Sequence, residues 1–216
     1  MFTRLEGPEK EKAFLDQFDI GDELSTPDQV ERFKDMLKYL HRGFANEVNT
    51  KEQAGLPVAM RLRLQPGTEP VARPPLRVNY QQREIIRQHV DDMKRMGIVE
   101  DSQSAWASAV VLSMKPNGKW RFNFDARGIN KHTIVDHYPL PRTEDVLERL
   151  KGAKYFSLGD FTSGFWQVPV RKEDRDKFAF ITPDGLYQWT RMPFGYVNSP
   201  AVWQRVVNLL CAGFTW

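Results

Sequence analysis

Apolar residues recur at helical spacing in four stretches of the chain, and two of these stretches begin with clear capping signals. Thr26 and Pro27 open the first stretch, since threonine caps helix N-termini and proline fits the first helical position. The helical spacing of the residues that follow predicts a helix that runs to about Gly43. A second helix is predicted after Asn79, which has Gln82 at capping-box spacing.

The second helix should bury one apolar stripe, and Gly97 fits the position just beyond its C-terminus. The stripe consists of Ile85, Ile86, His89, Val90, Met93 and Met96. Residues 143–150 are expected to form a capped amphipathic helix, and Ser199-Pro200 starts a fourth helix. The apolar side of the fourth helix holds Val202, Val206, Leu209 and Leu210.

Alternating apolar and polar residues predict two β-hairpins. The first joins residues 109–114 to residues 119–125 through a Pro-Asn-Gly turn at 116–118, which favours a tight connection. The second spans residues 178–192 around the turn at 182–185, and residues 98–100 form a short extra strand. Residues 58–64 alternate weakly, as in a possible strand. Helices mixed with antiparallel hairpins indicate an α+β fold.

Composition and charge change this picture only in part. The chain has 216 residues, of which 41% are hydrophobic and 27% are charged, a balance typical of globular proteins. Residues 1–40 hold ten acids and six bases (−4), and residues 41–216 hold 18 acids and 25 bases (+7). A basic body suits a polyanionic partner, although a surplus of this size also occurs in proteins that bind none.

Two further features of the composition point to an intracellular protein. The one cysteine, Cys211, excludes a disulfide framework and a cysteine zinc site. No apolar run reaches the length of a membrane span, and the first residues lack the profile of a signal peptide. We therefore expect an intracellular location, cytoplasmic or nuclear, and no membrane partner.

The chemistry most worth testing lies in residues 155–168. The bulky residues up to Leu158 favour a buried strand, and Gly159 lets another backbone approach closely. Asp160 ends this apolar run, where an ionised carboxylate is costly unless a cation or hydrogen-bond donors meet it. Asp160 is therefore either a metal ligand for phosphoryl transfer or a carboxylate that caps the turn at 162–164.

Five ordered motifs identify a resemblance to a known family. They are GIVEDSQSAWAS at 97–108, WRFNFDARGINK at 120–131, YPLPR at 138–142, FSLGDFTSGF at 156–165 and MPFGYVNSP at 192–200. Together they resemble the reverse transcriptases of gypsy-type LTR retrotransposons, over roughly residues 56–216. Several motifs in the family's order are a far stronger signal than one short pattern.

The resemblance implies an α+β fold with reverse-transcriptase-like fingers and a truncated palm. Residues 1–55 would be an N-terminal helical extension and linker. Residues 56–134 with 168–198 would form the fingers, and residues 135–167 with 199–216 an incomplete palm. The implied activity is that of an RNA-directed DNA polymerase, which transfers a nucleotide by a two-metal mechanism with Mg²⁺ or Mn²⁺. The implied partners are an RNA or DNA template–primer, deoxynucleoside triphosphates and the remainder of a retroelement polyprotein.

The family's motifs also assign roles to individual residues. Asp160 would be the first metal-binding aspartate, and the carbonyl of Phe161 would add a backbone ligand. Lys115 and Arg121 would hold the triphosphate, an interaction for which the planar arginine side chain is well suited, although a solvated hairpin lysine is the alternative for Lys115. Phe165 falls at the family's aromatic steric gate, which leaves no room for a 2′-hydroxyl; the alternative is a core aromatic residue.

Five further positions complete this assignment. Phe194 and Gly195 would line the nucleotide pocket, and Asp125, Arg127 and Asn130 would brace the fingers or touch the template. Two residues depart from the gypsy-type pattern: Trp166 replaces a histidine and Phe178 replaces a threonine. These departures leave the metal site intact but put the fine geometry of substrate binding in doubt.

The family needs a second motif, aromatic-x-Asp-Asp, after the last helix, and residues 199–216 do not contain it. Asp91 and Asp92 look similar, but they precede Asp160 within a helical pattern and are expected to face solvent. Without that motif, residues 155–158 should lack a strand partner, and Val206, Leu209 and Leu210 should be underburied. Three interpretations stay open at this point: part of a polymerase, an inactive relic that binds nucleic acid or protein, and a fragment that does not fold stably.

Overall fold

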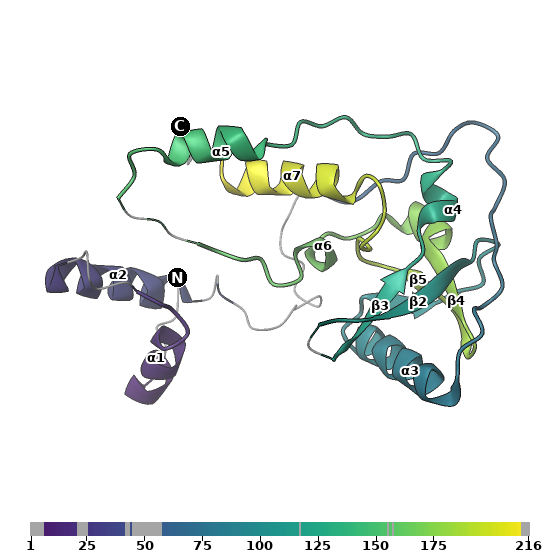
Figure 1. Cartoon of the computed structure of the whole chain (residues 1–216), viewed down its shortest axis with the longest axis horizontal. Helices are drawn as coiled ribbons and strands as arrows, with labels where there is room; N and C mark the ends of the chain where they lie inside the picture. The colour runs from purple at the N-terminus through teal and green to yellow at the C-terminus, as the bar shows by residue number, and fades with distance from the viewer. Residues whose placement is uncertain are drawn as a thin grey trace. The chain divides into compact units, whose positions relative to one another are not determined.

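The computed structural model of the chain describes residues 7–20, 26–41, 44, 58–116, 118–154, 156 and 158–212, within two compact units, residues 1–47 and 48–216. The first unit contains helix α1 (Pro8–Leu15) and helix α2 (Pro27–Tyr39) (Figure 1). The predicted cap of α2 is confirmed, because Thr26 and Gln29 form a capping box.

The predicted end of α2 near Gly43 is wrong, since the helix stops at Tyr39. The Nδ1 atom of His41 lies 2.8 Å from the carbonyl oxygen of Lys38, so a side chain occupies an acceptor that a further helical turn would use. The rings of Phe14, Phe18 and Phe44, from the segments that follow α2 and contain α1, pack edge to face with centroids 5.0–5.9 Å apart.

The second unit is built on a five-stranded sheet in the order β1-β5-β4-β2-β3. The strands are β1 (Val99–Asp101), β2 (Ser108–Met114), β3 (Trp120–Phe124), β4 (Ala179–Thr182) and β5 (Gly185–Trp189). Neighbouring strands are antiparallel except for the parallel pair β2–β4. Both predicted hairpins are therefore confirmed; Asn117 of the first turn lies outside the described residues, and Gly118 has a φ of 75°.

Helix α3 (Tyr80–Arg95) begins at the predicted capping box and packs against the sheet at β1 and β3 (Figure 1). Ile86, Val90 and Met93 are buried at the centre of its stripe. Gly97 takes a φ of 69° just beyond the helix, a conformation that glycine adopts at low cost. Asp91 and Asp92 are exposed on the other side of α3, as expected of a solvated face.

The remaining helical segments surround the functional motifs. They are α4 (Arg127–Asn130), α5 (Thr143–Leu150), α6 (Gly164–Gln167), the 3-10 helix η2 (Lys172–Phe178) and α7 (Ser199–Leu210). Helix α5 is present but lacks the expected cap, because Arg142 occupies the N-cap position and makes no side-chain cap bond. In α7, Leu209 and Leu210 are exposed as predicted, but the prediction for Val206 is wrong, because that side chain is fully buried in the core. Among the described residues, no helix is both long and apolar enough to cross a membrane.

The predicted buried strand before Asp160 is also wrong. Phe156 is 65% exposed and Leu158 is fully exposed, and no strand is assigned between α5 and α6 in the part of the chain that the structure describes. Tyr155 and Ser157 lie outside the described residues. A strand is stable only when a neighbour accepts and donates its backbone hydrogen bonds, and none of the five strands of the sheet lies beside this segment.

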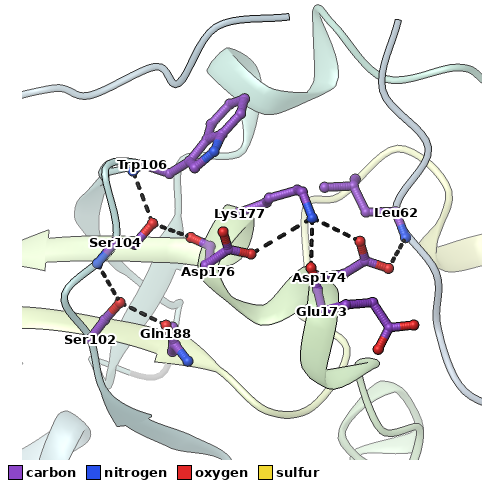
Figure 2. Close-up of polar contacts among 9 residues, drawn as sticks. All are labelled: Leu62, Ser102, Ser104, Trp106, Glu173, Asp174, Asp176, Lys177 and Gln188. Atoms are coloured by element: carbon purple, nitrogen blue, oxygen red, sulfur yellow. Dashed lines mark hydrogen bonds and ion pairs between the residues drawn. The ribbon is translucent and has the colours of Figure 1, made fainter. Parts of the chain in front are cut away.

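A polar network around the buried carboxylate of Asp174 holds η2 in place, and with it the backbone that follows α6 (Figure 2). The buried carboxylate of Asp174 accepts a hydrogen bond from the backbone N–H of Leu62 at 3.0 Å and pairs with Lys177 at 3.0 Å. Ser104 donates to the carbonyl of Asp176 at 2.6 Å and connects the loop before β2 to the same helix. Met60 also forms an isolated parallel β-bridge with Val170. Residues 58–64 therefore hold the backbone just after α6 in place.

Candidate functional site

The site begins with a tight turn at residues 160–167. The carbonyl oxygen of Phe161 accepts the backbone N–H of Gly164 at 3.1 Å, and the side-chain amide of Gln167 donates to the carbonyl of Thr162 at 2.9 Å. Ser163 is left-handed, with φ 46° and ψ 47°, and is the only non-glycine residue with positive φ in the described parts of the chain. Asp160 precedes this turn and is exposed, so the expectation of a buried acid is corrected.

The turn brings Phe165 against Phe194, which comes from a loop almost thirty residues further along the chain. The two rings are stacked, with centroids 4.9 Å apart and an interplanar angle of 28°. Trp166 also packs against Phe194 in an edge-to-face arrangement, with centroids 6.0 Å apart. The Phe194 ring is 52% exposed, so the stacked pair presents an accessible aromatic surface.

The loop that carries Phe194 is held by a glycine and by Asn130. Gly195 has a φ of 90°, and a Cβ atom there would lie 3.3 Å from the carbonyl oxygen of Phe124, so a larger residue would be strained and crowded. Asn130, at the end of α4, donates to the carbonyl of Gly195 at 2.9 Å and accepts from the backbone N–H of Val197 at 3.0 Å. Asn130 therefore holds the loop in place, and its expected role in bracing the fingers or touching the template stays a prediction.

Asp125 and Arg127 brace the start of α4. The guanidinium of Arg127 donates to both carboxylate oxygens of Asp125 at 2.8 and 2.9 Å, and Arg73 lies 3.6 Å away. The hydrogen bonds from Arg127 lower the pKa of the Asp125 carboxyl, and burial opposes this shift. This arrangement supports a bracing role, and the Arg127 side chain is itself exposed.

Asn198 is a site-supporting residue that the sequence reasoning did not single out. It is only 5% exposed, donates to the carbonyl of Ile134 at 2.9 Å and accepts from the backbone N–H of Asp136 at 2.9 Å. Asp136 in turn pairs with Arg205 of α7, and this lowers the pKa of its carboxyl. The only signal in the sequence is that Asn198 directly precedes the Ser-Pro start of a helix.

Lys115 and Arg121 lie apart from this set of contacts. Lys115 directly follows β2 and is partly buried, whereas Arg121 on β3 is exposed and pairs in register with Ser113. Within the described ranges, a series of contacts links the 160–167 turn through Phe165 and Phe194 to the loop that Asn130 holds. Neither Lys115 nor Arg121 takes part in it. Their role in triphosphate binding stays a prediction.

The residues present do not complete a metal centre. No group of three or more histidine, cysteine, aspartate or glutamate residues suited to a metal ion occurs in the described residues. Asp160 is a single exposed carboxylate, and the Phe161 carbonyl already accepts the Gly164 N–H. Two cations that clamp a reacting phosphate need more anionic ligands than this.

Phe178 and Trp166, the two residues that depart from the expected motif pattern, both pack in or against the core. Phe178 is buried and meets the Tyr196 ring edge to face at 5.0 Å, so it packs beneath the loop that carries Phe194. The ring of Trp166 lies 6.4 Å from that of Trp189, so the indole packs against the core, and neither Nε1 atom meets a hydrogen-bond acceptor among the described residues.

Comparisons with known proteins agree with this geometry. Residues 113–215 match the family described as reverse transcriptase (RNA-dependent DNA polymerase). The retrovirus-related Pol polyprotein from transposon 412 of Drosophila melanogaster is 39% identical over 151 residues, which make up 67% of this chain and 12% of that protein. An enzymatic polyprotein of cauliflower mosaic virus (strain BBC) is 27% identical over 213 residues, or 94% of this chain and 30% of the viral protein.

Solved structures share the fold. A foamy viral protease–reverse transcriptase in complex with double-stranded DNA superposes with a TM-score of 0.75 at 22% identity, over 98% of this chain and 36% of that chain. The prototype foamy virus protease–reverse transcriptase CSH mutant gives a TM-score of 0.73 at 23% identity, over 100% of this chain and 28% of that chain. The fold is thus the predicted fingers-and-palm type, and residues 113–215 of the chain belong to the reverse transcriptase family, with relatives among retrotransposon polyproteins.

Proposed function

We propose that this chain is the nucleotide- and template-binding part of an RNA-directed DNA polymerase of a retroelement. The observation that carries the proposal is the stacked pair of Phe165, in the turn that follows Asp160, and Phe194, from the loop at 192–198. A ring fixed beneath the sugar of an incoming nucleotide would exclude a 2′-hydroxyl. Stacking against Phe194 would restrict the movement of the Phe165 ring, so that it could not yield easily to a larger sugar.

A divalent cation, Mg²⁺ or Mn²⁺, belongs to the proposal because it would stabilise the charge that develops during phosphoryl transfer. Asp160 and the carbonyl of Phe161 are the proposed ligands within the chain. They do not satisfy a two-ion centre, so the proposal requires further carboxylates that the described residues do not supply. The functions assigned to this chain are therefore binding and sugar discrimination.

The proposed partners are a template–primer and deoxynucleoside triphosphates. The foamy viral relatives were solved with an RNA/DNA hybrid and with double-stranded DNA, and residues 41–216 of this chain carry a net charge of +7. Lys115 and Arg121 are the proposed triphosphate ligands, and Asp125, Arg127 and Asn130 support the template side. An intracellular setting, with the rest of a polyprotein as partner, is part of the same proposal.

Binding of a DNA primer–template at increasing salt tests this proposal. Affinity should fall at least about tenfold between 50 and 200 mM salt, because each neutralised phosphate releases counterions. Arg121→Ala should weaken triphosphate binding more than template binding, whereas Arg32→Ala, which removes the same charge from an exposed position of α2, should change neither. Salt-insensitive binding, or no binding at low salt, would contradict the proposal.

A further inference from the structure

One side chain of α7 touches the 160–167 turn at three places, and no motif reasoning assigned it a role. The indole of Trp203 meets the ring of Phe161 edge to face, with centroids 5.2 Å apart and an interplanar angle of 85°. The same indole meets Phe165 at 6.2 Å and 62°. Trp203 therefore lies between the residue that follows Asp160 and the proposed steric gate.

The third contact is with Gly164, which lies between those two phenylalanines in the sequence. A Cβ atom at Gly164 would lie 2.6 Å from Cζ2 and 2.8 Å from Cη2 of Trp203, closer than real side chains approach. The indole thus packs directly on the backbone of the turn. Position 164 accepts only glycine while a tryptophan occupies position 203.

The segment before the turn has few other constraints. Asp160 is exposed, Leu158 is fully exposed, and no strand flanks them among the residues with described placement. The ring contact between Phe161 and Trp203 is the aromatic contact nearest to Asp160 in the chain. Besides the hydrogen bonds within the turn, the indole of Trp203 is thus a contact that links the residue after Asp160 to Phe165.

From these contacts we infer that Trp203 is a positioning residue that fixes the Asp160–Phe165 turn and thereby sets the discrimination between deoxy- and ribonucleotides. This inference rests on the proposed function, because Phe165 must act as the gate. Trp203 acts through Phe161, Gly164 and Phe165.

The packing half of the inference is tested by a double-mutant cycle in the full 216-residue chain. Gly164→Ala should lower the thermal midpoint, and Trp203→Phe should relieve that loss, because the smaller ring lacks the Cζ2 and Cη2 atoms that the new methyl group meets. Gly159→Ala is the matched control, since a Cβ there meets nothing within 4 Å. Strictly additive effects of Gly164→Ala and Trp203→Phe would overturn the close contact.

The positioning half needs a measurement that a purely structural role would not move. We would measure binding of base-fluorescent 2-aminopurine deoxy- and ribonucleoside triphosphates to the chain with a primer–template and Mn²⁺. Trp203→Ala should reduce the preference for the deoxynucleotide by roughly fivefold to tenfold, the factor to which the free energy of about one aromatic pair corresponds. Trp203→Phe should restore most of that preference.

Trp106→Ala serves as the control, because it removes a buried indole away from the turn and should leave the ratio of the two affinities unchanged even if stability falls. An unchanged ratio in Trp203→Ala would overturn the inference and leave Trp203 as core packing only. A parent chain that binds neither triphosphate, or binds both equally, would refute the proposed function itself and, with it, the positioning role.

Discussion

Replacing Asn198 should destabilise the second unit more than its modest size suggests. Its side chain is almost fully buried and makes two hydrogen bonds of 2.9 Å, to the carbonyl of Ile134 and from the backbone N–H of Asp136. Its amide also lies 3.4 Å from the hydroxyl of Tyr196. Each bond contributes about 1 kcal/mol net, and each partner left unpaired costs about 1–3 kcal/mol, so Asn198→Ala should lose on the order of 2–4 kcal/mol.

A loss of this size should lower the thermal midpoint by on the order of 5–10 °C for a unit of this length. Differential scanning calorimetry gives that midpoint, and hydrogen exchange should show faster exchange of the Asp136 amide, which loses its acceptor. Asn208→Ala is the matched control: Asn208 is exposed on α7 and donates to the Tyr138 hydroxyl at 2.7 Å, where water can replace it. The control should cost less than about 1 kcal/mol.

Asn198→Asp sharpens the test, because it keeps the shape and changes one donor into an acceptor. At neutral pH the carboxylate would face the carbonyl oxygen of Ile134, so the destabilisation should be at least as large as for Asn198→Ala. In acid the protonated carboxyl can donate to that carbonyl, and part of the stability should return. Two results would contradict this reasoning: a free energy of unfolding of Asn198→Ala within about 0.5 kcal/mol of the parent, or no recovery of Asn198→Asp stability in acid. Either would mean that the hydrogen bonds of Asn198 to residues 134 and 136 do not hold this part of the chain.

Four further predictions follow from the same structure. The polypeptide of residues 1–216 alone should not extend a primer with Mg²⁺ or Mn²⁺, since Asp160 cannot hold two cations; template-dependent extension that is lost on Asp160→Asn would contradict this. In a polypeptide extended with the palm hairpin and thumb of a related element, Phe165→Val should admit ribonucleotides better, and an unchanged sugar preference would show that Phe165 is only core. Burial raises the pKa of Tyr196 to about 12, above the ordinary value of about 10, so the stability held by its neutral phenol is complete below pH 10 and is lost as the pH rises through about 12. Tyrosinate absorbance compared between the parent and Tyr196→Phe checks this, and a Tyr196 step at the ordinary pKa refutes it. Finally, backbone amides of residues 158–161 should exchange much faster than those of β4, and equal protection would mean that this segment has a partner.

Elements specified by local interactions were predictable from the sequence. The helix cap at Thr26, the capping box at Asn79 and both hairpins appear where the pattern places them, because a cap or a tight turn involves residues only a few positions apart. The ordered motifs also identified the family. The division of the second unit into fingers and palm stays a prediction.

Where the predictions were wrong, the outcome depended on a distant partner. Residues 156–158 have the composition of a buried strand, but a strand needs a neighbour, and the described sheet does not provide one there. Val206 was expected to be underburied and is instead enclosed by the core. The end of α2 at Tyr39 is the exception, because it depends on the nearby side chain of His41 and not on the apolar spacing.

The sequence by itself determined the family, the local elements and the identities of Asp160, Phe165 and Phe194 as candidates. Only the tertiary structure decided that Phe165 stacks on Phe194, that Asn130 and Asn198 hold the loop beside them, and that Trp203 packs on Gly164. The physical reason is one of range. Helix caps and turns are settled by neighbours along the chain, whereas ring stacking, buried amide hydrogen bonds and the burial of an acid depend on which distant segments the fold brings within a few ångströms.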